Sequence, residues 1–440
     1  MRTRSLPALA LLAVVVVRGA TVPQASGQIP VDTLRLGALH EAALAADPRG
    51  EQIDLLATQT DLRLRNLAVG RLPSLTLQGQ GQYQSDVITF PFQLPGGGSP
   101  PVPPKDTYDA QLAVRQRLYD ATTAAQRAVE RARLAEEQAR VRTALHERRQ
   151  AVNDAYFAVL RLRAQQEEIE SAVTDLGARL DLARERVEQG AALPSEAETI
   201  RAELLRRRQS LDQLAAEEGA TRAVLEDLTG RSIPAGAALG LPALADEVAT
   251  ARAAVGELRQ RPEYARFARG RELVERQRAA VGASERPRVS AYGRAGYGRP
   301  GLDPLAVDFD SYWLAGVQLE WAPWRWGTAE RDREVLSIQQ RILDTEEASF
   351  ADAIERAAVR EMANIDRLER ALATDGDIVA LRQTILTETR LRFAEGVVTS
   401  AEYVDRETDL LDARLARIAH DVELAHARAR FLTLLGVEIP

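Results

Sequence analysis

The 440-residue sequence contains no cysteine and few aromatic residues. The lack of cysteine excludes disulfides, thiolate metal sites, cysteine nucleophiles and a lipid-modified N-terminal cysteine. Aromatic residues make up only 5% of the chain. Alanine and arginine are abundant instead, a balance that suits interlocked helices better than a thick globular interior. The net charge of −7 gives no support to nucleic-acid binding.

The sequence also lacks a hydrophobic run long enough for a membrane-spanning helix. Its one strongly apolar run, Leu9–Val17, follows Arg2 and Arg4 and precedes small residues that end at Gly27. This order is typical of a secretory signal, so we expect 1–27 to be removed from the mature chain. The protein is therefore expected to be exported without a helical membrane anchor.

Motifs that carry catalytic chemistry are absent as well. The chain has no HExxH motif, no GxSxG motif and no phosphate-binding glycine loop. The four histidines are too scattered to form a set of metal ligands, and His420 and His426 are off the same-face spacing of a helix, so we expect them to be solvated. We therefore expect no enzyme, no metal site and no cofactor.

What the sequence does have is a proline-free stretch from Asp120 to Gln189, rich in Ala, Leu, Arg and Glu. Apolar residues recur in it at steps of three and four, which predicts a narrow helix seam with left-handed supercoiling. At about 1.5 Å per residue, roughly 70 helical residues span on the order of 100 Å. The seam positions are Val152, Ala155, Val159, Leu162, Ile169, Val173, Leu176, Leu180, Ala183 and Val187.

The second half of the chain repeats the design of the first. A proline-started helical segment leads to a second proline, then to a strand hairpin, a long helix and a return helix. We expect a first repeat at 28–229 and a second at 247–440, separated by a Gly/Pro/Ala linker at 230–246 with little structure of its own. The expected hairpins are 75–118 and 288–321, the long helices 120–189 and 328–395, and the return helices 195–229 and 399–435.

Each long helix is expected to end in a sharp turn, at Gly190 or Gly396. Shortly after each glycine, a hydroxyl residue precedes a glutamate by three positions: Ser195 with Glu198, and Thr399 with Glu402. This spacing predicts a capping box, in which the hydroxyl accepts a hydrogen bond from a free N–H group at the helix start. Both return helices should therefore begin with a side-chain cap.

The expected strands alternate between polar and apolar residues, and their length of about ten residues matches a tilted strand that crosses a bilayer. Because a soluble half-buried sheet alternates in the same way, both interpretations stay open for a single strand. Two hairpins cannot close a barrel alone, so a membrane location requires a barrel shared between protomers. Candidate lumen residues on the polar faces are Gln78, Gln80, Gln82, Arg115, Gln318 and Glu320. Aromatic residues near the strand ends, as in a membrane girdle, are Tyr83, Tyr297, Trp313 and Trp321, with Trp324 and Trp326 just beyond.

These features together resemble the TolC-type outer-membrane efflux channels. The resemblance rests on the signal, on the twofold repeat and on the tip sequence from Arg392 to Asp405, and it spans the mature chain. It implies a mainly α fold of long antiparallel coiled coils with a membrane β-barrel portion. Three protomers of a homotrimer would form a 12-stranded barrel continuous with an α-helical tunnel. Membrane retention would rest on that barrel alone, since no lipid-attachment cysteine is present.

The resemblance also implies partners and sites. The duct would lie in the outer membrane, contact its lipid, and meet a periplasmic adaptor and an inner-membrane transporter. Adaptor contacts would fall on the tip turns, at Gly190, Ser195, Glu198, Gly396 and Thr399. Glu402 and Asp405 match the positions of acidic side chains that ring the pore.

Several alternatives stay open at this point. Glu402 is either a pore residue or only a helix cap. The chain is either an efflux duct, the outer-membrane duct of a type I protein secretion system, or an exported soluble coiled-coil scaffold or adaptor. Nothing in the residues separates drug, metal or polypeptide cargo, or the class of pump.

Overall fold

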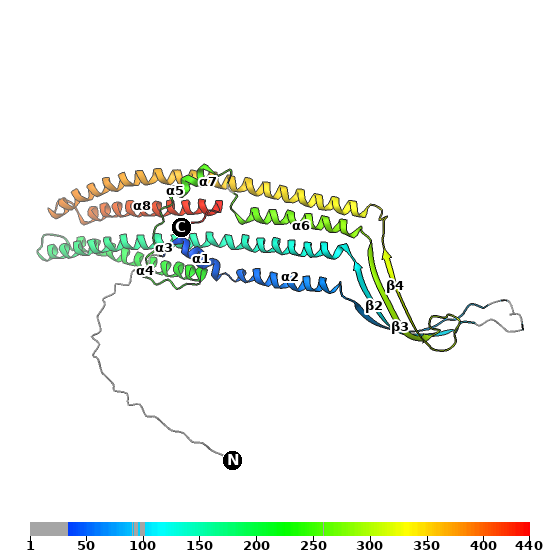
Figure 1. The fold of residues 1–440 in the computed structure, drawn as a ribbon. Coiled ribbons are helices and arrows are strands. Elements are labelled where there is room, and N and C mark those ends of the chain that lie inside the picture. The colour runs from blue at the N-terminus through cyan, green and yellow to red at the C-terminus, as the bar shows by residue number, and fades with distance from the viewer. Residues whose placement is uncertain (1–33, 90, 92–95, 97–101, 258) are drawn as a thin grey trace, which may run out of the picture.

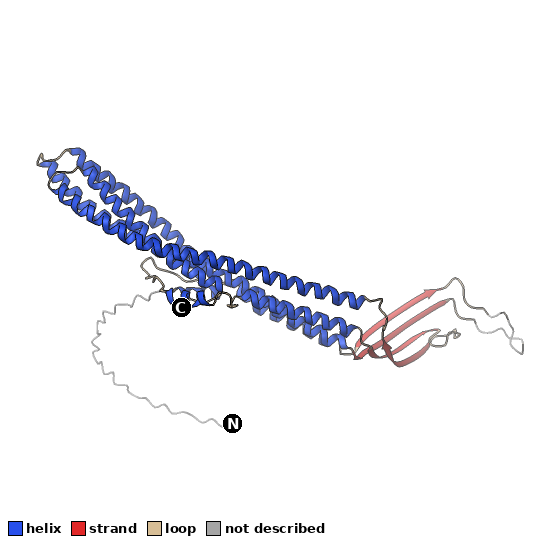
Figure 2. Cartoon of the chain, turned by 90° about the horizontal axis from the view of Figure 1, so that it is seen from above, coloured by secondary structure: helices blue, strands red, loops and turns tan. Residues whose placement is uncertain are grey.

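Long helices form most of the structure, and one sheet lies at their far end (Figure 1 and Figure 2). The computed structural model describes residues 34–89, 91, 96, 102–257 and 259–440, so the expected signal at 1–27 lies outside the described residues. The helices are α1 (Leu36–Ala46), α2 (Glu51–Val69), α3 (Ala121–Glu188), α4 (Pro194–Thr229), α5 (Ala245–Ala253), α6 (Pro262–Ser284), α7 (Thr328–Ala394) and α8 (Ser400–Leu435), with a 3-10 turn η1 (Pro48–Gly50). The strands are β1 (Ser74–Tyr83), β2 (Asp106–Tyr119), β3 (Arg288–Arg299) and β4 (Asp310–Glu320).

The two longest helices, α3 and α7, have 68 and 67 residues. Asp120 begins α3 by accepting a hydrogen bond from the backbone N–H of Thr122 at 2.9 Å. The seam of α3 is buried as predicted, with Val173 and Val187 only partly so. Among the described helices, none has an apolar stretch long enough to cross a membrane.

The helices pack in two sets along the rod. Toward the sheet, α2 packs on α3, α3 on α6 and α6 on α7, whereas toward the other end α4 pairs with α3 and α8 pairs with α7 (Figure 1). Helix α3 also packs against α8. The two halves of the chain are therefore interlocked side by side rather than separate.

The four strands form one antiparallel sheet in the order β1-β2-β3-β4. Directly paired residues lie on the same face of an antiparallel sheet. The register pairs Leu77 with Leu112, Leu112 with Ala295, and Ala295 with Trp313, so these side chains share one apolar face. The other face is polar. Within the described residues, β1 and β4 have no partner on their outer edges.

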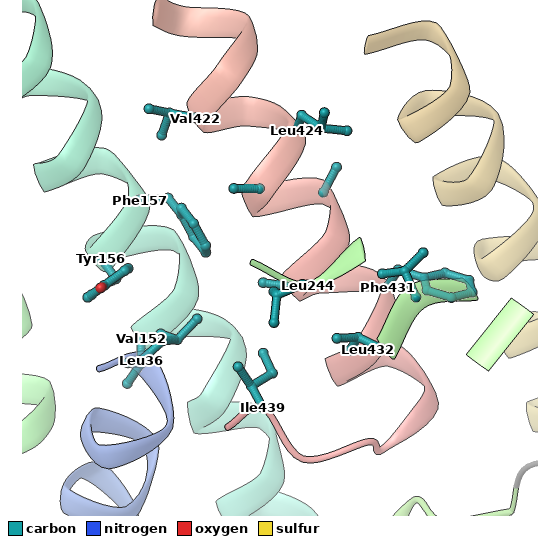
Figure 3. Packing of buried hydrophobic residues seen from close by; sticks show 14 of the residues in the cluster. Leu36, Val152, Tyr156, Phe157, Leu244, Val422, Leu424, Phe431, Leu432 and Ile439 are labelled. Atoms are coloured by element: carbon teal, nitrogen blue, oxygen red, sulfur yellow. The ribbon is translucent and has the colours of Figure 1, made fainter. Parts of the chain in front are cut away.

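As expected, the segment at 230–246 forms little regular structure before α5, but it packs into the core instead of only joining the two repeats. Leu244 (Figure 3) and Ile233 are fully buried in the main hydrophobic core, and α5 begins at Ala245. The phenol of Tyr156 on α3 donates to the backbone carbonyl of Gly240 at 2.5 Å. This core forms because α3 has a second buried face here, since the adjacent Tyr156 and Phe157 are both buried.

A buried polar network joins α1, α3 and α8 next to this core. His40 Nε2 lies 2.7 Å from Asn153 Oδ1, and Asn153 Nδ2 donates to Thr433 Oγ1 at 2.9 Å. His146 Nε2 lies 3.1 Å from the Thr433 carbonyl. Burial lowers the pKa of His40 to about 4 and also lowers the pKa of His146. Both rings are therefore neutral in the folded protein at neutral pH.

We predict that acid weakens this part of the fold. The unfolded chain protonates His40 near its ordinary pKa of 6.5, whereas the folded chain does so only at about 4. Stability is therefore complete above pH 6.5 and is lost as the pH falls toward 4, by about 3 kcal/mol from this group. His40→Gln should show a flatter pH profile of the thermal midpoint. Equal profiles for both proteins would contradict the assignment.

Candidate functional site: the helix tip and the two faces of the sheet

The two turns that join the long helices to their return helices lie together at the end of the rod opposite the sheet (Figure 1). Gly190 and Gly396 adopt left-handed backbone angles, with φ of +68° and +75°. In the first turn the Ala191 N–H donates to the Arg186 carbonyl at 2.8 Å, and the second turn repeats this bond at 2.9 Å. These are the glycine-terminated helix ends that the sequence predicts.

The two return helices begin differently. Thr399 caps α8 as predicted, because its hydroxyl accepts a hydrogen bond from the Glu402 N–H at 3.2 Å. The prediction that Ser195 caps α4 is wrong. The helix starts at Pro194, so Leu193 occupies the N-cap position, where it makes no side-chain hydrogen bond. Proline is favoured at the first helical position because its fixed φ suits the helix and it has no N–H to satisfy. Pro194 thus moves the helix start ahead of Ser195.

Contacts between the two turns bind them into one body. Arg186, near the end of α3, donates to the carbonyls of Phe393 and Ala394 at the end of α7, and the first of these bonds is 2.9 Å long. Ser400 Oγ donates to Glu196 Oε2 at 3.3 Å. An apolar cluster fills the space behind the turns, with Leu176, Leu180, Ala183, Ala197, Ile200 and Leu204 from α3 and α4, and Leu386, Phe393, Tyr403, Val404 and Leu410 from α7 and α8.

A polar seam crosses from the first coil to the second beside this cluster. Asp175 on α3 accepts hydrogen bonds from Arg390 on α7 and from the phenol of Tyr403 on α8, the latter at 3.2 Å. Next to it lies a cavity of about 240 Å³ between α3, α7 and α8. Its polar lining consists of Glu168, Ser171, Asp175, Gln383, Arg390, Glu407 and Arg414.

Arg207 is the most deeply buried charge in this seam, with 3% of its surface exposed. It donates to Glu203 at 2.9 Å and to Glu407 on the other coil at 2.6 Å. Burial raises the pKa of Glu407 despite this bond. Burial acts in the same direction on Glu203, but hydrogen bonds from Arg206 and Arg207 hold its pKa below the ordinary value. One guanidinium thus joins the two coils through two carboxylates.

Glu402 and Asp405 both lie exposed on the first turns of α8. Within the described part of the chain, neither carboxylate has an ion-pair partner, whereas Glu198 on the first return helix lies 3.5 Å from Arg201. At these matched positions, the second return helix therefore presents two free carboxylates, and the first presents an arginine and a glutamate that pair with each other.

The register places the six candidate lumen residues on the polar face of the sheet: Gln78, Gln80, Gln82, Arg115, Gln318 and Glu320. On the same face Gln111 donates to Gln78 at 2.9 Å, and the Tyr312 phenol donates to Asp109 at 2.6 Å. Tyr83, Tyr297 and Trp313 lie on the opposite, apolar face and are largely exposed. Trp321 follows directly after β4.

Two histidines lie in different surroundings from those predicted. His420 is not simply solvated, because its Nδ1 lies 2.6 Å from Asp375. His426 stacks on Phe157, with ring centroids 5.0 Å apart, and contacts Asp154 at 2.9 Å. Among the residues that the structure describes, no three His, Asp or Glu side chains gather closely enough to hold a metal ion.

Sequence reasoning missed the polar seam, although the repeat contained a signal for it. Glu203 and Glu407 occupy equivalent positions of the two return helices, at the same spacing as Ser195 and Thr399. Both face the interior. A carboxylate at an interior position of both repeats indicates a shared cationic partner, because buried charges are paired.

We predict unequal effects when the two tip hydroxyls are removed. Thr399→Ala removes a side-chain cap and should cost about 1 kcal/mol of stability, seen as a lower thermal midpoint. Ser195→Ala is the matched control and should leave the midpoint unchanged, because Ser195 does not cap α4. Equal losses in both variants would contradict the assignment of the caps.

Comparisons with known proteins add to this geometry. No protein-family model matches the chain, and no curated protein sequence does. The structure is similar to that of CusC, described as a transmembrane channel, with a TM-score of 0.67 and 15% identity over 91% of this chain and 92% of that chain. It is similar to the outer membrane protein VceC from Vibrio cholerae, with a TM-score of 0.63 and 17% identity over 92% of this chain and 97% of that chain. For the open MtrE outer membrane channel from Neisseria gonorrhoeae the TM-score is 0.63, with 18% identity over 92% of this chain and 89% of that chain. The chain therefore has the fold of the TolC-type outer-membrane channels.

Proposed function

We propose that this protein is the outer-membrane duct of a tripartite efflux system. It would act as a passive exit for substrates that an inner-membrane pump and a periplasmic adaptor deliver. The observation that carries this proposal is the sheet, which has one apolar face, one polar face and two unpaired edges at the end of a long helical rod.

The two unpaired edges favour a shared barrel. In hydrocarbon every backbone N–H and C=O group needs a partner, so an open sheet is not tolerated there. Pairing β4 of one protomer with β1 of the next closes the sheet without new strands. Three copies would give 12 strands, a number within the range of known membrane barrels. The apolar face, with Leu77 and Trp313, would contact lipid, and the glutamine-rich face would line a wet lumen.

The helices would continue this barrel as a tunnel through the periplasm. Helix α3 has 68 residues, and at about 1.5 Å per residue it reaches on the order of 100 Å from the sheet to the tip. The tip turns at Gly190 and Gly396 are then the part of the duct farthest from the membrane. We propose that they are the adaptor-binding surface.

Glu402 and Asp405 are the proposed constriction. In a trimer three copies of each free carboxylate would face one another across the pore, and their repulsion and attraction for cations would depend on spacing and salt. Adaptor binding at the turns would separate the coils of one protomer. Because the polar seam joins those coils, opening would break contacts such as Arg390 with Asp175.

Membrane extraction tests the duct against the alternative of a soluble scaffold. We expect the mature protein to stay with the outer-membrane fraction and to require detergent for release. In gels it should migrate as a trimer that heating converts to a monomer, because the shared barrel resists mild denaturation. A water-soluble monomer would overturn the proposal.

Single-channel recording tests the tip. Glu402→Ala and Asp405→Ala should lower cation preference, because each removes a ring of free charge. Glu198→Ala is the matched control with a smaller expected effect, since Arg201 already neutralises Glu198. Unchanged conductance and ion preference in Glu402→Ala and Asp405→Ala would remove both residues from the gate.

The polar seam has a test of its own. Asp175→Asn should raise the open probability of the channel by weakening the contact between the coils. An unchanged open probability in this variant would exclude the seam from opening.

A further inference from the structure

The segment between β4 and α7 presents three tryptophans to the outside of the protomer. Trp321, Trp324 and Trp326 are 58%, 73% and 79% exposed. The rings of Trp324 and Trp326 meet edge to face, with centroids 5.8 Å apart. Large aromatic rings stabilise a protein mainly through the burial of their apolar surface, and exposed rings lose that stabilisation. A cluster of exposed rings therefore indicates a surface that contacts a partner.

The backbone of this segment is strained at one of the exposed rings. Trp326 has a φ of +52°, and among the described residues it is the only one other than glycine in the left-handed region. A bulky side chain is a genuine outlier there, and such outliers cluster at functional sites. The next residue, Gly327, also has a positive φ, so this turn requires two consecutive left-handed residues, and a tryptophan occupies the first of them.

The depth of the segment follows from the length of β4. Trp313 lies near the loop end of the sheet, paired with Ala295. A tilted strand needs roughly 9–11 residues to cross the hydrocarbon. Strand β4 has 11 residues and ends at Glu320, so Trp324 and Trp326 fall just beyond that distance. In the proposed duct this is the headgroup layer of the periplasmic leaflet.

The two ends of the sheet differ in charge. The helix end carries mostly arginine, whereas the loop end carries mostly aspartate. The basic residues of the helix end are Arg71, Arg117, Arg286, Arg288 and Arg325, against Asp120, Glu285 and Glu320. The acidic residues of the loop end are Asp86, Asp106, Asp109, Asp303, Asp308 and Asp310, against Lys105 and Arg299.

Arg325 is free to bind an anion at the helix end. Asp120 already contacts Arg117 at 3.4 Å, and Glu285 is paired with Arg333. Within the described residues, Arg325 has no carboxylate partner and donates only to the Ser284 hydroxyl, at 3.3 Å. Arg325 stands between Trp324 and Trp326 in the sequence, and both indoles are exposed. A guanidinium flanked by indoles suits a phosphate at a membrane surface.

We propose that Trp324, Arg325 and Trp326 form a strap that binds the headgroups of phospholipids in the periplasmic leaflet. Arg325 contacts the phosphate, and the indoles lie among the glycerol and carbonyl groups. The strap rests on the proposed function, since it takes the sheet as the membrane part. Pairing of β4 with β1 of the next protomer would bring the Arg71 of that protomer toward Arg325, so the positive charge at this edge favours an anionic headgroup over a contact between the two arginines.

Quenching of tryptophan fluorescence tests the strap. All four tryptophans lie within 313–326, so replacing the others by Phe gives full-length proteins that keep only Trp313, Trp324 or Trp326. Each is reconstituted in vesicles of phosphatidylethanolamine and phosphatidylglycerol that contain lipids brominated near the headgroup or near the middle of the acyl chain. We expect the shallow bromine to quench Trp324 and Trp326 about twofold more than the deep one.

The outcomes separate failure of the strap from failure of the duct. Quenching of Trp313 without quenching of Trp324 and Trp326 would overturn the strap and leave the membrane sheet intact. If acrylamide in water then reaches the two indoles, they face the periplasm; if it does not, a neighbouring protomer covers them. Loss of lipid quenching at Trp313 as well would overturn the proposed function itself.

Two further variants test the role of the charge and of the strained ring. Arg325→Gln should reduce the rise in thermal midpoint on transfer from detergent to phosphatidylglycerol vesicles, whereas Arg341→Gln, exposed farther along α7, should not. Trp326→Gly relieves the left-handed strain, so it should keep or raise the midpoint in detergent yet lower it in vesicles. Identical behaviour of the two arginine variants, or a gain in both media for Trp326→Gly, would contradict headgroup binding.

Discussion

The pairing of backbone groups at the two outer edges of the sheet is the constraint on which the rest of the structure depends. Strands β1 and β4 carry rows of N–H and C=O groups that have no partner within the described protomer. If the apolar face contacts lipid, no water is present to form hydrogen bonds with those groups. Only a strand of another copy can then pair with them. The number of strands per chain, the alternation of the faces and the position of the helices at one end of the sheet all fit this need.

The helical rod divides into regions with different kinds of contact. Near its middle, an apolar core built around Tyr156 and Phe157 receives α1, α5 and the segment between the repeats. Toward the tip, the contacts between coils become partly ionic, with Arg207 held between Glu203 and Glu407. Breaking a buried ion pair costs free energy, but water can hydrate the separated charged groups once the coils move apart. A rigid middle and a wettable seam suit a body that opens only at one end.

Most of the fold could be predicted because its signals are local. Proline-free repeats, terminal glycines and alternating strands define elements whose ends lie within a few residues of those expected. The cap at Ser195 was predicted wrongly because Pro194 competes for the same helix start. The burial of the segment at 230–246 was not predicted, because it depends on the distant Tyr156. The polar seam was missed for the same reason, since Arg207 and Glu407 meet only after the two repeats have packed. The strand faces followed from alternation alone, whereas contacts between repeats did not.

The interlocking of the two halves has a consequence for biogenesis. Strand β2 pairs with β3, and α3 packs on α6, across the boundary between the repeats. A chain exported from its N-terminus would therefore expose the edge of β2 and the face of α3 that packs on α6 until the second repeat follows. Because such surfaces invite aggregation in an aqueous compartment, the nascent polypeptide would need a holding chaperone during transit. Assembly of the finished oligomer would then begin only after synthesis of the whole chain is complete.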